Sequence, residues 1–330
     1  MKNRNVLISS GGRRGQLVRR FQQTLVDENL DGQVFVAEAS EYAPAAYLAD
    51  GWFRVPRVES AGFINEILRL CDENSIGLVI PTIDTELEIF SQYADAFRDL
   101  GTTMVVSAAE TIRIAGDKML TNHWLVQNEF LAPRRWSTDE LGSGIDPNCL
   151  PIICKPAKGS RSRDVEVIRE NSDITRLARR NDVVIEDWID GDEYTVSTYV
   201  DSTGKCVSAV PRKRLEIRDG EVSKAVTENF PEIQALASSI VECLPGAYGP
   251  LNIQIIREKL TDRLFVIEIN ARFGGGDPLA WEAGASSPKW LVQEHQGRDL
   301  RIGPWESGLM MLRFDQAVYL SVDQDNGRIN

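Results

Sequence analysis

Two polar side chains stand two residues apart inside the apolar, β-branched segment that opens Phe265–Gly276. Side chains alternate along a strand, so Glu268 and Asn270 are predicted to share one face of a sheet. Carboxylate and amide oxygens suit Mg²⁺, which takes one or two protein carboxylates and leaves its other positions to water and phosphates. A strand whose polar face meets solvent explains these two residues equally well. Arg272 continues the same face, and three glycines follow it.

Charged pairs also lie at the ends of two other predicted strands. Asp84 and Glu86 follow a strand at the end where ligands of open α/β sheets bind, and they suit a cationic group such as an amine. The alternative, which we favour, is that Asp84 or Thr85 caps the next helix. Lys213 and Arg214 suit a phosphate or a substrate acid, but a cluster of cations is equally typical of a solvated face.

The elements that must position these residues begin with an α/β layer. Strands alternate with helices over the first ~105 residues, which predicts a parallel sheet. The turn Ser10–Gly15 reads G-G-x-x-G, so we favour a tight strand-to-helix turn or a substrate-facing loop over a nicotinamide site. The predicted strands are 6–9, 34–37 and 76–81, and the predicted helices are 16–29, 63–74 and 87–100.

The rest of the chain mixes hairpins with helices. Lys155 ends one predicted strand and is followed by a polar, basic loop, which suits phosphates or is an ordinary hairpin tip. Residues 137–148 are predicted to be a connector and residues 297–330 to contain a last strand pair. The predicted helices are 112–130 and 231–243, and the predicted strands are 150–155, 164–168, 183–189, 194–200, 206–211, 251–257 and 262–270.

The composition narrows the class of protein. A chain of 330 residues with a net charge of -12 and no lysine-arginine block argues against a nucleic-acid partner. The five cysteines are scattered, and no apolar run reaches membrane-spanning length, so we expect a reduced, cytoplasmic protein with no membrane partner. With only two histidines, His123 and His295, a histidine-based mechanism is not expected.

In their order along the chain, these motifs resemble the ATP-grasp family, particularly members related to the carbamoyl-phosphate synthase large subunit. The resemblance covers roughly Val6 to Gly284. Its most specific parts are a hinge of the form E-x-x-[IVL]-x-G-x-E that begins at Glu186, and the E-x-N pair that begins at Glu268. The phosphate loop departs from the family pattern, because Arg161 and Asp164 stand where glycine is usual.

The resemblance implies a function for each of these motifs, with ATP and Mg²⁺ (or Mn²⁺) as cofactors. It implies catalytic roles for Lys118, Lys155 and Arg272. The implied nucleotide-binding residues are Lys118, Lys155, Gly159, Ser160, Ser162, Glu186, Asp187, Ile189 and Glu193, the metal ligands are Gln254, Glu268 and Asn270, and the substrate residues are Asp84, Glu86, Lys213, Arg214, Gly274, Gly275 and Gly276.

The implied fold is α/β, with α+β lobes. A parallel pre-ATP-grasp layer at 1–105 precedes a linking helix and small lobe at 106–188 and a large lobe with the metal site at 189–330, and ATP binds between the two lobes. The implied enzyme is a carboxylate–amine ligase that forms a carbon–nitrogen bond. Its partners are small-molecule carboxylates and amines, and homodimers are common in the family.

Two alternatives belong to other classes. Arg161 and Asp164 are compatible with an ATP-binding protein that has no ligase activity. The other alternative is carbamate or carboxylate kinase activity, as in carbamoyl-phosphate synthesis. Chain length counts against that one, because those large subunits carry two tandem grasp units and only one is visible here.

Overall fold

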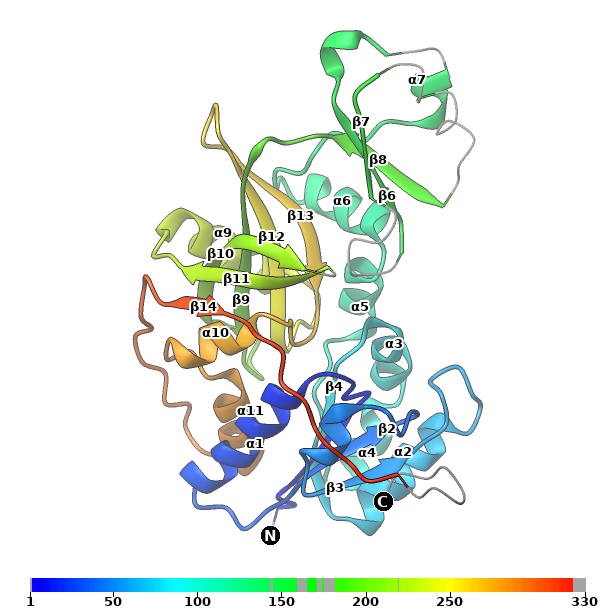
Figure 1. Ribbon diagram of the computed structural model, residues 1–330, viewed down its shortest axis with the longest axis vertical. Coiled ribbons are helices and arrows are strands. Elements are labelled where there is room, and N and C mark those ends of the chain that lie inside the picture. Colours follow the sequence, from blue (N-terminus) through cyan, green and yellow to red (C-terminus); the bar gives the residue numbers. More distant parts are fainter. Residues whose placement is uncertain are drawn as a thin grey trace. The chain divides into compact units, whose positions relative to one another are not determined.

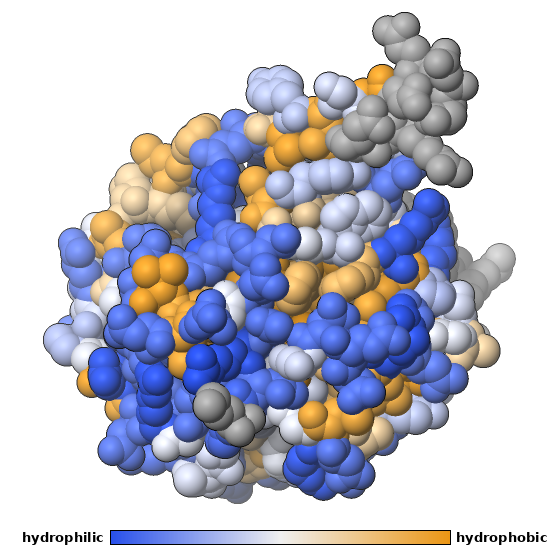
Figure 2. All heavy atoms as spheres, turned by 90° about the horizontal axis from the view of Figure 1, so that it is seen from below, coloured by the Kyte–Doolittle hydropathy of each residue, from blue (hydrophilic) through white to orange (hydrophobic). Residues whose placement is uncertain are grey.

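The computed structural model in Figure 1 describes residues 2–142, 145–158, 165–170, 174, 182–218 and 220–322. The chain forms two compact units. Unit 1 contains residues 1–107, 284–304 and 313–330, and unit 2 contains residues 108–283 and 305–312. Hydrophobic residues lie in patches between hydrophilic ones on the face shown in Figure 2, as on most folded proteins.

Unit 1 is built on a five-stranded parallel sheet with the order β3-β2-β1-β4-β5. All six residues of β4 are buried, as expected for a parallel sheet that is covered on both faces. The strands are β1 (Asn5–Ser9), β2 (Val34–Glu38), β3 (Gly51–Arg54), β4 (Ile76–Pro81) and β5 (Thr103–Met104); the helices are α1 (Gly15–Asp27), η1 (Pro44–Tyr47), α2 (Phe63–Glu73), α3 (Asp84–Gln92), α4 (Ala94–Asp99) and α11 (Ser287–Gln296).

The segment 284–304 is tied to the N-terminal layer by buried polar contacts. Glu28 accepts hydrogen bonds from Gln293 Nε2 and Arg298 Nη1, both at 2.9 Å. The ring of His295 lies 2.9 Å from the Asn3 carbonyl and 2.9 Å from the Thr103 hydroxyl. Burial lowers the pKa of His295 below its usual value, so the folded state favours the neutral ring.

Unit 2 contains a small three-stranded antiparallel sheet with the order β7-β6-β8. Its strands are β6 (Ile152–Pro156), β7 (Glu166–Ile168) and β8 (Val183–Asp187). Apolar side chains from this sheet and from α7 (Thr138–Gly142), among them Ile152, Ile185 and Leu141, form its own core.

The larger sheet of unit 2 is antiparallel, with the order β13-β12-β9-β10-β11-β14. The helix α9 (Pro231–Cys243) contacts β9, β10 and β12. Together with the parallel layer of unit 1, the two antiparallel sheets confirm the predicted fold class. The strands are β9 (Gly191–Val200), β10 (Cys206–Arg218), β11 (Glu221–Thr227), β12 (Gly249–Glu258), β13 (Leu264–Asn270) and β14 (Met310–Leu312); the remaining elements are α5 (Ala109–Ala115), α6 (Lys118–Gln127), η2 (Pro147–Cys149) and α10 (Asp277–Glu282).

Several sequence-based boundaries were wrong. The segment predicted as one helix over 112–130 is two helices, because Asp117 caps α6 by accepting hydrogen bonds from Met119 N and Leu120 N. The helix predicted over 87–100 likewise begins earlier, at Asp84, and is interrupted at Tyr93. In the described part of 297–330, a single strand, β14, replaces the expected strand pair and pairs with β11.

Candidate active site

One face of the larger sheet of unit 2 carries a row of polar side chains. In the antiparallel register, Gln254 of β12 stands opposite Glu268 of β13 and opposite Thr195 of β9. Thr195 in turn stands opposite Arg212 of β10. Opposed residues point to the same side of a sheet, so four strands contribute polar side chains to this row.

Hydrogen bonds join Glu268 and Gln254 of this row to two charged residues on β10 and β9, Arg214 and Glu193. Gln254 Nε2 donates to Glu268 Oε2 at 2.9 Å, and Arg214 Nη1 donates to Gln254 Oε1 at 3.3 Å and also to Glu193. Lys118, at the start of α6, brings its Nζ to 3.9 Å from Glu268 Oε1. Burial raises the pKa of Glu193, and the Arg214 guanidinium opposes that rise. Two cations and two carboxylates therefore lie together, none of them more than 27% exposed.

The donor set at this site suits a hard cation. Within the residues that the structure describes, His, Cys, Asp and Glu form no cluster of three that would hold a metal ion. Glu268 therefore needs amide oxygens and phosphate oxygens as co-ligands, a set that Mg²⁺ accepts. Asn270 stands opposite Asn252, the next position along the strand face from Gln254. The side-chain N–H of Gln254 donates to Glu268. The Gln254 amide would therefore have to rotate before its oxygen could bind Mg²⁺ beside Glu268.

The small sheet holds a buried ion pair. Lys155 Nζ on β6 lies 2.6 Å from Glu186 Oε2 on β8, and the two side chains are 11% and 3% exposed. Asn122 of α6 reaches the other carboxylate oxygen at 3.5 Å and donates to the Pro133 carbonyl at 2.8 Å. The structure thus joins two residues that the sequence predicted as separate nucleotide ligands.

The hinge between the two sheets runs from the end of β8 to the start of β9. The Asp187 N–H donates to the Arg134 carbonyl at 3.0 Å, and its carboxylate accepts from Trp136 Nε1 at 2.7 Å. These bonds fix the strand before it reaches Ile189 and Glu193. Of the predicted phosphate loop, Gly159, Ser160 and Ser162 lie outside the described residues, as do Arg161 and Asp164.

The three consecutive cations of β10 have different partners. Arg214 faces Glu193 and Gln254, whereas Lys213 lies on the opposite face of the sheet, 2.7 Å from Asp192. Arg212 is 2% exposed. The structure therefore brings Arg214, and not Lys213, to the face that carries Glu268.

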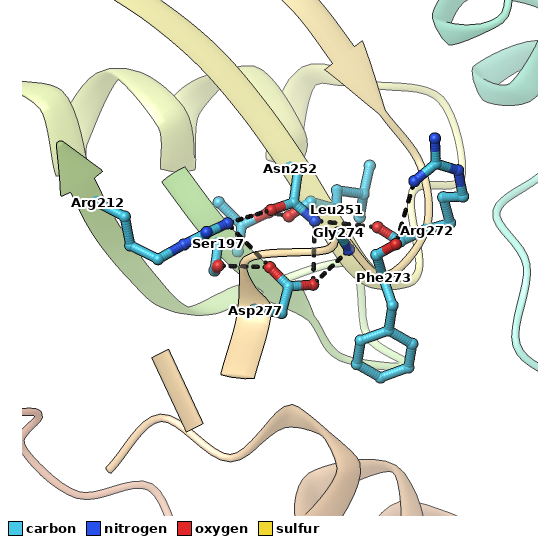
Figure 3. Close-up of polar contacts among 9 residues, drawn as sticks. Ser197, Arg212, Leu251, Asn252, Arg272, Phe273, Gly274 and Asp277 are labelled. Carbon is cyan, nitrogen blue, oxygen red and sulfur yellow. Dashed lines mark hydrogen bonds and ion pairs between the residues drawn. The ribbon is translucent and has the colours of Figure 1, made fainter. Parts of the chain in front are cut away.

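Arg212 is the centre of a buried polar network that sequence reasoning missed (Figure 3). Its Nη2 donates to Asn252 Oδ1 at 2.8 Å and to Asp277 Oδ1 at 3.0 Å. Ser197 Oγ donates to the same Asp277 oxygen at 2.7 Å. Burial lowers the pKa of Arg212, and the negative charge of Asp277 opposes this effect. Strand alternation was the usable signal, since Arg212 is two residues before Arg214.

The glycines after Arg272 are packed against this network. The Gly274 N–H, which the resemblance assigned to the substrate, donates to Asp277 Oδ2 at 2.6 Å instead. A Cβ on Gly276 would lie 2.0 Å from Arg212 Nη1, and one on Gly274 would lie 2.9 Å from Asn252 Oδ1. Two of the three glycines are thus required by close packing.

In unit 1, Glu86 lies fully buried at the ends of β1 and β4. Its carboxylate accepts from Ser9 Oγ, Ser10 Oγ and the N–H groups of Thr82 and Ile83, at 2.6 to 3.2 Å. Burial raises the pKa of this carboxyl. Ile83, not Asp84 or Thr85, occupies the cap position of α3, so the favoured capping interpretation was wrong. The contacts of Glu86 explain it as a residue that joins strand ends to α3.

Two family models match the chain in succession. Residues 6–105 match the PylC-like N-terminal domain, and residues 115–276 match the ATP-grasp domain. A D-alanine–D-alanine ligase of Rickettsia felis is 28% identical over 182 residues, which is 49% of this chain and 55% of the ligase. The chain thus matches about half the length of that curated relative.

Solved structures share the fold at lower identity. The biotin carboxylase domain dimer of Hydrogenobacter thermophilus 2-oxoglutarate carboxylase, solved with MgADP, ADP and bicarbonate, is 17% identical, with a TM-score of 0.72 over 92% of this chain and 71% of that one. N5-carboxyaminoimidazole synthetase of Staphylococcus aureus is 15% identical, with a TM-score of 0.70 over 91% of this chain and 78% of that one. In the parts of the chain that the structure describes, no helix is long and apolar enough to cross a membrane. With both domain models matched in chain order, the chain belongs to the ATP-grasp superfamily and combines an ATP-grasp domain with a PylC-like N-terminal domain.

Proposed function

We propose that the protein is a Mg²⁺- and ATP-dependent ligase that activates a small carboxylic acid or amino acid as an acyl phosphate and joins it to an amine. The observation that carries this proposal is the sheet face on which Glu268, Gln254, Arg214 and Glu193 meet, with Lys118 beside them. Fixed cations beside a hard-cation donor set are what phosphoryl transfer needs, because positioning and charge neutralisation supply most of its catalysis.

In this proposal, the small sheet and the hinge bind the nucleotide. Lys155 supplies positive charge for the phosphates, and its contact with Glu186 holds the ammonium in place until they arrive. Glu186 accepts from the adenine amino group, the backbone of Asp187 and Ile189 binds the adenine edge, and Glu193 binds the ribose hydroxyls. Gly159, Ser160 and Ser162 would cover the triphosphate.

The larger sheet then supports the chemistry. Glu268, Asn270 and Gln254 would hold Mg²⁺, which when bound offsets charge on the phosphates. Lys118 is close enough to Glu268 to add a fixed positive charge at the same place. Arg272 orients the substrate carboxylate for attack on the γ-phosphate and stabilises the negative charge of the acyl phosphate until the amine displaces phosphate.

The remaining parts of the proposal concern organisation and partners. We infer a pre-ATP-grasp domain at 1–105, a small lobe at 106–188 and a large lobe that begins at 189. Residues 284–304 and 313–330, predicted as part of that lobe at 189–330, belong to unit 1 instead. The substrates are a small carboxylate and an amine, to which we assign Asp84, Arg214, Gly275 and Gly276; the contacts of Glu86, Lys213 and Gly274 remove those three from the predicted set. The protein is assigned to the cytoplasm, supported by five free cysteines, and to a homodimer, which its mass in solution would test.

The test is to incubate the protein with ATP, Mg²⁺ and a panel of paired amino acids and small carboxylates, and to measure ADP and phosphate. At least one pair should give turnover that needs both partners. Glu268→Gln should lower it by at least about 100-fold, because it removes the carboxylate of the metal site. Glu232→Gln, on the exposed first turn of α9, is the matched control. ATP binding without turnover of any pair would refute the ligase.

A further inference from the structure

The buried network around Arg212 holds the backbone on both sides of Phe273. Asn252 Nδ2 donates to the Arg272 carbonyl at 3.0 Å, and the Gly274 N–H donates to Asp277 Oδ2 at 2.6 Å. Figure 3 shows these bonds on the two sides of Phe273, and the Arg272 side chain donating from Nη1 to the Phe273 carbonyl at 3.1 Å. The two peptide groups that flank Phe273 are thus held by two side chains, Asn252 and Asp277, which Arg212 joins to each other.

At the centre of the network, the Asp277 carboxylate is fully hydrogen-bonded to protein groups. Asp277 accepts from Arg212, Ser197, Asn252 and the Gly274 N–H, so both of its carboxylate oxygens are used twice. Arg212, Asn252 and Asp277 are each 2% exposed.

Stability alone is a poor reason for such a network. A buried ion pair loses hydration, and well-packed apolar residues of similar volume are often as stabilising or more so. Arg212 Nε also finds no hydrogen-bond partner among the described residues, so the pair is incompletely satisfied. What an apolar cluster cannot do is hold a peptide carbonyl and a peptide N–H in fixed directions.

We propose that Arg212, Asn252 and Asp277 are positioning residues that fix the backbone of the Arg272–Gly274 turn and so preorganise the Arg272 guanidinium for phosphoryl transfer. This inference rests on the proposed function. Its energetic basis is that donors already aimed at developing charge need no reorganisation during the reaction. None of the three residues touches the reacting atoms; each acts through Arg272.

The test uses the full chain and a binding probe that needs no identified substrate. Calorimetry measures the affinity for ADP with Mg²⁺, first alone and then with fluoroaluminate as a mimic of the transferring phosphoryl group. Asn252→Ala removes the bond to the Arg272 carbonyl. We expect affinity for Mg²⁺ and ADP to stay within about twofold, and the tightening by fluoroaluminate to fall about tenfold, the scale of coupling between contacting groups.

A double-mutant cycle with Arg272→Ala separates positioning from general damage. If Asn252 acts through Arg272, Asn252→Ala should cause no further loss of tightening in the Arg272→Ala background. Thr198→Val is the matched control, since it deletes a buried hydrogen bond of 3.0 Å to the Leu251 carbonyl in the same sheet. It should lower the melting temperature and leave fluoroaluminate binding unchanged.

Asp277→Asn repeats the cycle with a side chain of the same shape, in case Asn252→Ala does not fold. Equal losses in both backgrounds would overturn the positioning role, as would an equal effect of Thr198→Val. A wild-type protein that binds Mg²⁺ and ADP but gains nothing from fluoroaluminate would refute the phosphoryl-transfer function itself, and this inference with it.

Discussion

The ion pair between Lys155 and Glu186 gives a stability prediction that can be worked out from its burial. Removing one partner of a buried pair costs about 3–5 kcal/mol, because the other charge is left uncompensated. Glu186 is 3% exposed, and among the described residues its other side-chain hydrogen bond is the one from Asn122 at 3.5 Å. We therefore expect Lys155→Met to lower the free energy of unfolding by about 3 kcal/mol, the lower end of that range.

Replacing Glu186 should lower the free energy of unfolding by less than replacing Lys155. Lys155 is 11% exposed, and in Glu186→Gln its ammonium keeps an amide oxygen as acceptor. We expect a loss of about 1–2 kcal/mol, the scale of weakening one charge-assisted hydrogen bond. In the double variant no charge is left unpaired, so its loss should fall short of the sum of the single losses by about 1–3 kcal/mol.

Thermal unfolding followed by circular dichroism measures these differences, since each kcal/mol shifts the melting temperature by about 2–4 °C in a domain of this size. The pair between Lys213 and Asp192 is the matched control. Its 2.7 Å separation is similar, but its side chains are 26% and 42% exposed. Its coupling should be below about 1 kcal/mol. Losses that add within about 0.5 kcal/mol for Lys155 and Glu186 would refute the coupling.

Two further predictions concern stability. Burial lowers the pKa of His295 from 6.5, so the unfolded state binds a proton at this ring more readily than the folded state does. The contribution of His295 to the free energy of unfolding should be constant above about pH 6.5 and fall below it. Urea titrations of His295→Gln should show a smaller fall than those of the wild type. Gly276→Ala should cost about 1–3 kcal/mol, because its Cβ would meet the Arg212 guanidinium, while Gly303→Ala, where nothing lies within 4 Å, should be nearly neutral by the same melting assay.

Local sequence patterns predicted the elements that place the nucleotide and metal residues. The period of two along β13 placed Glu268 and Asn270 on one face, and β4 and α9 have the predicted bounds. β13 and α9 were predictable because burial on one face imposes a repeat within a few residues, and β4 because burial on both faces gives a continuous apolar run. The break before α6 was also encoded locally, as Gly116 followed by the capping Asp117, but was not recognised.

Contacts between distant strands were less predictable, because register and burial depend on the whole sheet. Lys155 and Glu186 looked like two independent ligands, yet β6 and β8 pair and bring their charges together. Glu86 was predicted as a substrate residue that could receive a cationic group. Its carboxylate is buried and accepts hydrogen bonds from the hydroxyls of Ser9 and Ser10. These two residues lie more than 75 positions away along the chain.

Arg212, Lys213 and Arg214 show this limit most clearly. Three successive cations suggest a solvated cluster, and strand alternation divides them between two faces without saying which face is buried. The partner that makes burial of Arg212 tolerable is Asp277, 65 residues later and outside the sheet. Asp277 also binds the Gly274 N–H, so the residue that compensates the buried charge is the one that fixes the turn after Arg272. The burial of Arg212 is therefore best explained by the turn that its counter-ion, Asp277, holds. The double-mutant cycle with Arg272→Ala tests this explanation directly.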